Sequence, residues 1–265
     1  MSTPFKSILC GVEGNPASTE AAKQAIALAK GGGDLQFTAV YTSFELGPDY
    51  HKDTLESSLE EAARLAAEAG VSASYELREA KYAIDVLLPE SQERDLLVIG
   101  THGNSRTSGI LFGSTASEAA HGAERPLLIA REAPNGAAFP KNILVASDGS
   151  SGSWEPVRAT AGLAAAFDAN VDVVHVADGK HDVDEDILGA QLAEIAEATG
   201  REPDLAKPDG HATREIVDTA KSKGSSLIVT GRRGLRGIKS LGSVSERIVV
   251  GAECSVLLIP VGDTA

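Results

Sequence analysis

Cysteine, tryptophan and the other aromatic residues are scarce in this chain of 265 residues. The two cysteines, Cys10 and Cys254, lie far apart and fit neither the spacing of zinc ligands nor a disulfide framework. We therefore expect both thiols to be buried and reduced, as is usual in a cytoplasmic protein. No apolar run reaches the length of a membrane span and no signal peptide is visible, so the sequence predicts neither membrane insertion nor secretion.

Positive charge is also in short supply, because 24 lysine and arginine residues stand against 38 aspartate and glutamate residues. The formal net charge is −14, and both halves of the chain carry an acidic excess. An acidic surface repels phosphate backbones and anionic lipid headgroups, so we expect neither a nucleic acid nor a membrane surface as a partner. The apolar fraction of 42% lets each half bury a core.

Familiar catalytic signatures are missing as well. The chain has no Ser-His-Asp pattern, no His-Glu-x-x-His and no P-loop lysine after its glycines. His175 lies on an apolar strand pattern, which is more typical of a hydrogen-bonded core histidine than of a catalytic one. The acidic run at residues 181–186 is typical of a solvated helix start, not of a metal cluster. We therefore predict no catalytic residue and no metal held by the protein alone.

What the sequence does contain is an alternation of strand and helix patterns that runs through the chain twice. Such alternation is typical of right-handed βαβ units with a parallel sheet. We predict an α/β fold with two tandem domains, each a five-stranded parallel sheet flanked by helices. The first domain is placed at residues 1–135, the second at 141–265, and a linker containing proline and glycine at 132–140. Strand patterns lie at 6–12, 35–41, 71–77, 95–99 and 126–130, and again from 141 and at 171–176, 201–205, 227–230 and 255–259.

Two glycine-rich stretches each follow a fourth strand pattern and precede a helix pattern. The first covers residues 100–115 and the second covers residues 231–244. Glycines let backbone N–H groups approach an anion, and a helix N-terminus adds unpaired donors and the positive end of a dipole. The layout of strand, glycine loop and helix start therefore indicates phosphate binding, although a tight connection without a ligand would have the same composition.

An acidic residue follows the first strand pattern of each half, Glu13 in one and Asp148 in the other. The carboxyl ends of parallel strands meet at one edge of the sheet, so each acidic residue should share a cleft with its glycine-rich stretch. The alternative is that Glu13 and Asp148 only satisfy N–H groups of a turn or of a helix start. Ser18 is the expected N-cap of the first helix, which should end at residues 31–33.

At this point the chain resembles the tandem two-domain members of the universal stress protein family. ATP-binding members of that family carry Gly-x2-Gly-x9-Gly-Ser/Thr after the fourth strand, and Gly100, Gly103, Gly113 and Ser114 match this spacing in full. The resemblance implies a flavodoxin-like fold of the adenine nucleotide alpha hydrolase type, a cytoplasmic stress response and a homodimer formed through the last strand. It also implies binding of ATP or a related adenine nucleotide, with Mg²⁺ or Mn²⁺ accompanying the phosphates.

The resemblance also implies which residues contact the nucleotide. The loop glycines and the following hydroxyl residues would hold phosphates, while the acidic residue and a second-strand backbone position would contact adenosine. In the first half these residues are Glu13, Val40, Gly100, Gly103, Gly113, Ser114 and Thr115. In the second half they are Asp148, Val176, Gly231, Gly234, Gly242 and Ser243.

Each half departs from the family pattern in a different place. The first half has Glu13 where the family usually has aspartate, and only seven residues separate Gly234 from Gly242 in the second half. The full loop spacing favours the first half as the binding half, although the second loop is the more basic. We expect the protein to act by binding nucleotide, not by turnover. Two alternatives stay open: a nucleotide-free dimeric interaction protein with vestigial motifs, and a slow ATPase.

Overall fold

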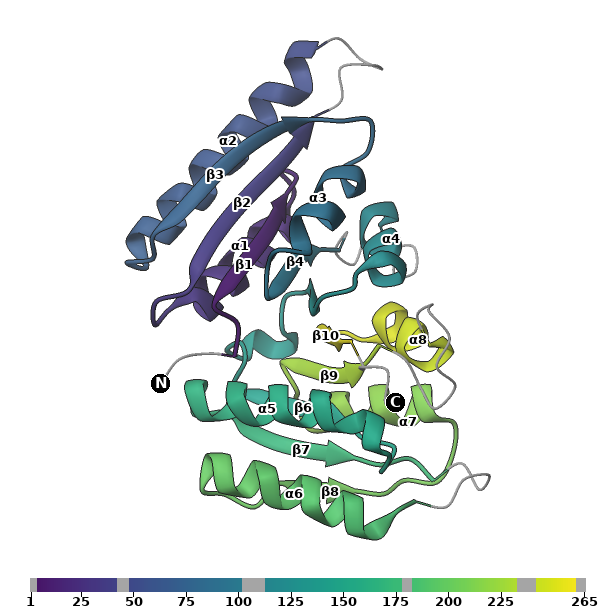
Figure 1. Ribbon diagram of the computed structural model, residues 1–265. Helices are drawn as coiled ribbons and strands as arrows, with labels where there is room; N and C mark the ends of the chain where they lie inside the picture. Colours follow the sequence, from purple (N-terminus) through teal and green to yellow (C-terminus); the bar gives the residue numbers. More distant parts are fainter. Residues whose placement is uncertain (1–3, 42–47, 102–112, 178–182, 233–241, 261–265) are drawn as a thin grey trace. The chain divides into compact units, whose positions relative to one another are not determined.

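The computed structural model describes residues 4–41, 48–101, 113–177, 183–232 and 242–260 (Figure 1). The chain divides into two compact units, residues 2–131 and 132–265, which correspond to the two halves of the sequence. Each unit is an α/β domain built around a five-stranded parallel sheet. The predicted fold class is therefore confirmed.

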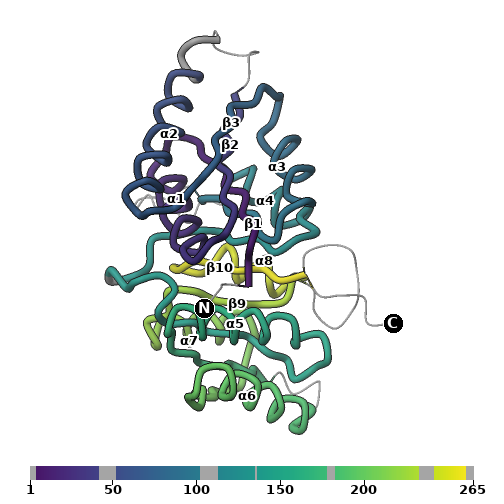
Figure 2. Tube along the Cα trace, turned by 60° about the vertical axis from the view of Figure 1, so that its left-hand side comes forward, coloured from purple at the N-terminus to yellow at the C-terminus, as the bar shows by residue number. Residues whose placement is uncertain are grey.

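The first half contains five strands and four helices among its described residues. Its sheet has the order β3-β2-β1-β4-β5, so β1 lies between its successor in sequence, β2, and a strand from later in the chain, β4. This reversal between β1 and β4 is the switch point at which ligands usually bind in such sheets. Figures 1 and 2 show α1 and α2 on one face of this sheet and α3 and α4 on the other. The elements are β1 (Ser7–Val12), α1 (Pro16–Ala29), β2 (Asp34–Tyr41), α2 (Pro48–Glu68), β3 (Ala73–Glu79), α3 (Ile84–Ser91), β4 (Leu96–Gly100), α4 (Ser114–Gly122) and β5 (Leu127–Ala130).

The second half repeats this arrangement, with the strand order β8-β7-β6-β9-β10. Its third strand, β8, is short and lies at the sheet edge between Pro203 and Pro208, as the prolines predict. The elements are η1 (Pro134–Gly136), β6 (Asn142–Ala146), η2 (Ser151–Ser153), α5 (Trp154–Phe167), β7 (Asn170–Val174), α6 (Glu185–Thr199), β8 (Asp204–Ala206), α7 (Ala212–Ser222), β9 (Leu227–Gly231), α8 (Ser243–Gly251) and β10 (Ser255–Ile259).

The core of each half is centred on the inner strands, whose apolar runs are covered on both faces. The side chains of Ile8, Leu9 and Cys10 in β1 have no exposed area, and β4 is buried in the same way. Both thiols are buried and neither is in a disulfide, as predicted. Burial away from water raises the pKa of the Cys10 thiol well above its ordinary value, because desolvation disfavours the thiolate. Within the described residues no helix is both long and apolar enough to cross a bilayer.

Several local predictions were wrong. Strand β3 (Ala73–Glu79) lies two residues later than the predicted 71–77, and β8 (Asp204–Ala206) replaces the predicted 201–205. Helix α1 begins at Pro16 and is capped by Asn15, not by Ser18. The Asn15 side chain accepts a hydrogen bond from the Ser18 backbone N–H at 2.8 Å, and the Ser18 hydroxyl accepts one from the Asn15 backbone N–H at 3.3 Å, so Ser18 is the third helical residue of a capping box. Strand β7 ends at Val174, two residues before the predicted end, although the His175 N–H still donates to the Ala206 carbonyl.

Candidate functional site

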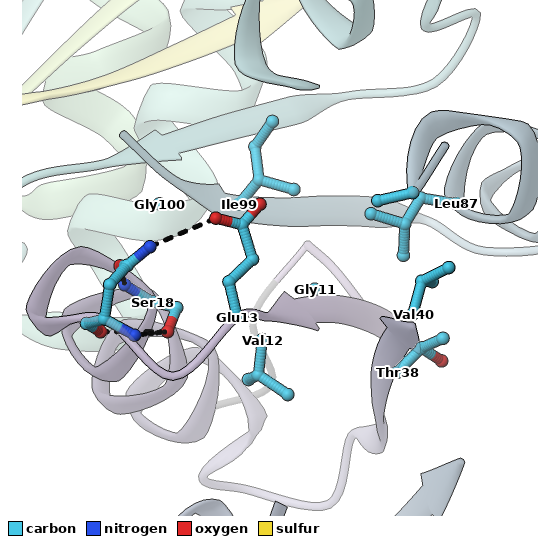
Figure 3. Close-up of a pocket in the computed structure, with 11 residues that line it drawn as sticks. Gly11, Val12, Glu13, Ser18, Thr38, Val40, Leu87, Ile99 and Gly100 are labelled. Carbon is cyan, nitrogen blue, oxygen red and sulfur yellow. Dashed lines mark hydrogen bonds between the residues drawn. The ribbon is translucent and has the colours of Figure 1, made fainter. Parts of the chain in front are cut away.

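A small cavity lies at the carboxyl ends of β1, β2 and β4 in the first half (Figure 3). Glu13 follows β1, Val40 lies near the end of β2 and Gly100 ends β4, and all three residues line the cavity. Thr38 and Leu87 form another part of its wall. The volume of about 20 Å³ is enough for about one water molecule. This inner cavity is therefore a polar-rimmed recess, not a space for a nucleotide base.

A larger outer cavity of about 200 Å³ lies beside it, and the two share Val40 and Ala83. The outer cavity reaches the first two residues of α4, Ser114 and Thr115. The continuous lining therefore leads from the switch point of the sheet to a helix N-terminus. The rest of its described wall consists of Tyr41, Ala80, Lys81, Tyr82, Ile84 and Glu118.

The N-terminus of α4 offers unpaired backbone donors to this outer cavity. Gly113 is the N-cap residue in an extended conformation, with φ −63° and ψ 150°, and no side chain caps the helix. Its carbonyl accepts the first intrahelical hydrogen bond, from the Ser117 N–H at 2.9 Å. The N–H groups of the first helical turn, which starts at Ser114, have no acceptor within the helix and carry the positive end of its dipole. This is the geometry that favours an anion.

The acidic residues after the first strands are held differently in the two halves. The Glu13 carboxylate accepts a hydrogen bond from the Asn15 side-chain amide at 3.1 Å, and Asn15 itself caps α1 (Figure 3). The Asp148 carboxylate instead accepts from the Ser150 backbone N–H at 3.0 Å. The alternative role that the sequence left open, bonding to a turn N–H, thus describes Asp148 but not Glu13.

Gly100 has a packing role that is independent of any ligand. A Cβ atom at Gly100 would lie 2.4 Å from the Ala17 carbonyl oxygen and 2.8 Å from the Ser18 nitrogen. Only glycine therefore lets the end of β4 approach the start of α1 this closely. This contact alone accounts for a glycine at position 100, whether or not the loop binds phosphate.

In the second half, the first and last glycines of the glycine-rich stretch lie at the corresponding places in the fold. Gly231 ends β9 and its carbonyl accepts from the Ser245 hydroxyl at 2.7 Å. Gly242 caps α8, which begins at Ser243, and the Gly242 N–H donates to the Arg232 carbonyl at 2.9 Å. Val176 lies two residues beyond β7. Gly103 and Gly234, the second glycines of the two loops, lie outside the described residues.

Several residues of the cavity walls were missed by sequence reasoning, among them the whole connection from β3 to α3. Its residues Ala80, Lys81, Tyr82 and Ala83 line the outer cavity, and Ala83 lines both cavities. The signal that could have found them is topological, because the connection after β3 also starts at the carboxyl edge of a parallel sheet. The amino-acid types alone gave no hint.

Two further expectations agree with the structure. His175 is buried, and its Nδ1 lies 3.1 Å from the Ser147 carbonyl, so this nitrogen carries the proton and donates. In the acidic run, Asp184 caps α6 by accepting from the N–H groups of Asp186 and Ile187. Across the described ranges no group of three or more histidine, cysteine, aspartate or glutamate side chains is close enough together to hold a metal ion.

Comparison with known proteins identifies the family. The pattern of the Universal stress protein family matches residues 4–131 and again residues 140–260. The chain is 30% identical over 144 residues to the universal stress protein MJ0531 of Methanocaldococcus jannaschii, covering 47% of this chain and 85% of that protein. It is 31% identical over 144 residues to the universal stress protein YxiE of Bacillus subtilis, covering 44% of this chain and 97% of that protein.

A solved structure supports the same fold. A universal stress protein from Archaeoglobus fulgidus superimposes with a TM-score of 0.79, covering 97% of this chain and 99% of that chain at 19% sequence identity. The fold, the repeated family match and the relatives agree. The chain therefore belongs to the universal stress protein family, as a member with two family domains in tandem.

Proposed function

We propose that this stress protein binds ATP or a related adenine nucleotide in its first half and acts through binding, not turnover. The observation that carries the proposal is the continuous lining from Glu13, through Val40, to Ser114 and Thr115. These four residues come from separate parts of the sequence, and the family resemblance independently implicated each of them.

The two ends of this lining suit the two ends of a nucleotide. The phosphates would lie against the uncapped first turn of α4, where backbone N–H groups and the helix dipole favour negative charge. The nucleoside would lie in the outer cavity beside Val40, with the Glu13 carboxylate facing it from the rim of the inner recess. A carboxylate can accept hydrogen bonds from ribose hydroxyls.

A divalent ion fits this arrangement only through the nucleotide. Within the described residues, the outer cavity has a single carboxylate, Glu118, which is too few ligands for a site made by the protein alone. Mg²⁺ or Mn²⁺ would be bound by phosphate oxygens and water, as Mg²⁺ usually is in nucleotide sites. When bound, the ion would offset charge repulsion between the phosphates and the acidic protein.

Glu118 supports slow ATP hydrolysis as a second candidate function. Its side chain lies in the outer cavity, one helical turn after Ser114, where a carboxylate could accept a proton from an attacking water. Phosphate release that disappears in Glu118→Gln while ATP affinity is retained would support turnover. Release at the background rate in both proteins would leave binding as the function.

The test of nucleotide binding uses calorimetry with ATP and Mg²⁺ on matched variants of the two halves. Ser114→Glu and Ser243→Glu each place a carboxylate at the first residue of a nine-residue helix, where it stabilises the helix but repels phosphate. We expect Ser114→Glu to weaken binding by more than about tenfold, because like charges would meet at short range, and Ser243→Glu to match the wild type. No heat and no thermal stabilisation with the wild type would contradict the proposal.

We further propose a cytoplasmic homodimer, as the family resemblance implies. Light scattering on the purified chain would measure its mass directly. Twice the chain mass of 27.4 kDa is the expected result, and a monomer at all concentrations would contradict it.

A further inference from the structure

The outer cavity has one cation among the described residues that line it, and that cation is Lys81. Lys81 lies in the connection from β3 (Ala73–Glu79) to α3, whereas the helix N-terminus in the same cavity belongs to α4. We propose that Lys81 is the lysine that binds the nucleotide phosphates in this protein. The inference rests on the proposed function and assigns a residue that lies outside the glycine-rich stretch.

The surroundings of Lys81 leave its charge available. Its Nζ lies 5.0 Å from the centroid of the Tyr82 ring, and Tyr82 is 54% exposed. Among the described residues no carboxylate lies within ion-pair distance of Lys81, whereas Lys52 faces Glu56 at 3.8 Å. An exposed cation–π contact is weak, so the ring can hold the ammonium near the cavity without preventing it from moving to an anion. The flexible four-carbon stem of lysine allows that movement.

The other groups in the cavity explain why a cation is needed there. Ser114 and Thr115 contribute neutral donors, and the dipole of α4 supplies only a partial positive charge. Glu118 adds a full negative charge to the same described lining. A phosphate chain at this place would meet net repulsion unless a lysine or a metal ion offsets it. Lys81 supplies that charge from the protein itself.

The second half has a different arrangement of charge at the corresponding place. Arg247 occupies in α8 the position that Glu118 occupies in α4, since each is the fifth residue of its helix. Its Nη1 lies 3.5 Å from Nε2 of His211, which stands in the connection from β8 to α7. The basic residue is thus Arg247 on α8 in the second half and Lys81 in the connection after β3 in the first half. The role proposed for Lys81 is therefore specific to the first half.

The experiment compares Lys81→Gln, Lys81→Arg and Lys52→Gln with the wild-type chain. Lys52 is the matched control, because its Nζ lies 5.8 Å from the ring centroid of Tyr41, another residue of the outer cavity, while Lys52 is absent from the described lining. Calorimetry measures the affinities for ATP and for adenosine at low and at high salt. We expect Lys81→Gln to weaken ATP binding about tenfold at low salt, as loss of a charge-assisted contact does, and to leave adenosine binding unchanged.

The salt dependence and the controls complete the test. High salt should reduce the difference between Lys81→Gln and the wild type, because screening weakens exposed charge pairs. Lys81→Arg and Lys52→Gln should bind ATP like the wild type. Equal ATP affinities for Lys81→Gln and the wild type, or an equal loss of adenosine affinity, would overturn the role of Lys81 alone. A wild-type chain that binds neither ligand would overturn the proposed function as well.

Discussion

The two halves of this protein have the same order of strands and helices, but different side chains stabilise the turn after the first strand. In both, a nine-residue helix with a glycine N-cap and no capping side chain follows the fourth strand. Beneath the turn after the first strand, however, the first half has the apolar Val12 and the second half has Ser147, both buried. Strand and helix patterns therefore determine where a ligand would bind in each half, whereas single side chains determine what the site can hold.

The turn of the second half is fixed by a buried polar network. The Ser147 hydroxyl lies 2.6 Å from the Gln191 side-chain carbonyl and 3.0 Å from the Ser153 hydroxyl. The Gln191 amide donates to the Ser153 hydroxyl at 3.1 Å, and Gln191 has no exposed area. Helix α6 thereby fixes the position of the turn that contains Asp148. In the first half, by contrast, the corresponding turn is held by the capping box of Asn15.

The largest expected effect comes from Gly100→Ala, which tests the close packing in the first half. The new Cβ would overlap backbone atoms of Ala17, which cannot move as a side chain can, so we expect a loss of about 1–3 kcal/mol or more in unfolding free energy. Hydrogen exchange measured by mass spectrometry should show the loss in first-half peptides. Gly189→Ala in the exposed part of α6 is the control; no atom lies near its Cβ, and it should stabilise the protein slightly. Equal exchange in Gly100→Ala and the wild type would contradict the packing role.

A second prediction concerns the Ser147–Gln191–Ser153 network of the second half. Gln191→Met keeps the approximate shape but removes the partners of two buried hydroxyls, so we expect a loss of about 1–3 kcal/mol in unfolding free energy. Chemical unfolding of Gln191→Met, Ser147→Ala and the double variant measures the coupling. The double variant should cost less than the sum of the single changes, because the residues share one network. Strictly additive losses in unfolding free energy would show that Gln191 and Ser147 contribute to stability independently.

The smallest expected effect is the pH dependence that one ion-pair cluster of the second half, around Lys223, contributes. Hydrogen bonds to Asp172, at 2.8 Å, and to Asp204 raise the pKa of Lys223 above its ordinary value. A raised pKa stabilises the fold at pH values below the unfolded-state lysine pKa of about 10.4, and this stabilisation is lost as the pH rises through the folded value. Because solvent reaches Asp204, which is 80% exposed, and part of Lys223, and screens the charges, we expect less than about 1 kcal/mol.

One ion pair of the first half supplies the contrast to Lys223. There, Arg94 donates to the Gln36 side chain and pairs with Asp34, and a guanidinium keeps its charge at these pH values. Unfolding followed from pH 9 to pH 11 should therefore show the alkaline loss in the wild type and a smaller loss in Lys223→Gln. The same alkaline slope in both proteins would rule Lys223 out as its source.

The fold could be predicted from the sequence because its signals are local and appear twice. Apolar runs such as the one at residues 95–99 are too short for helices and therefore indicate buried strands. A glycine such as Gly200 marks the end of a helix. The start of α1 was misjudged because Ser18 and Asn15 are both good N-caps, and Pro16, which suits the first helical position, decides for Asn15.

The candidate site could be predicted only in part. Ser114 was predicted through a loop spacing that the family shares, and Glu13 and Val40 through their places after the first strand and on the second. Lys81 and Tyr82 were not, because their place in the outer cavity depends on how the connection after β3 packs beside α4, a contact between segments distant in sequence. The packing role of Gly100 was hidden for the same reason, since it depends on a contact with Ala17.

The most direct test of nucleotide binding in the first half is an amide NMR titration of the whole chain with ATP and Mg²⁺. We predict the largest chemical-shift changes at the first turn of α4, from Ser114 to Ala116, and at Val40, because these groups border the outer cavity or lie at its helix N-terminus. The corresponding amides from Ser243 to Ser245 should change less. Changes confined to the second half, or no changes at millimolar ATP, would contradict the account.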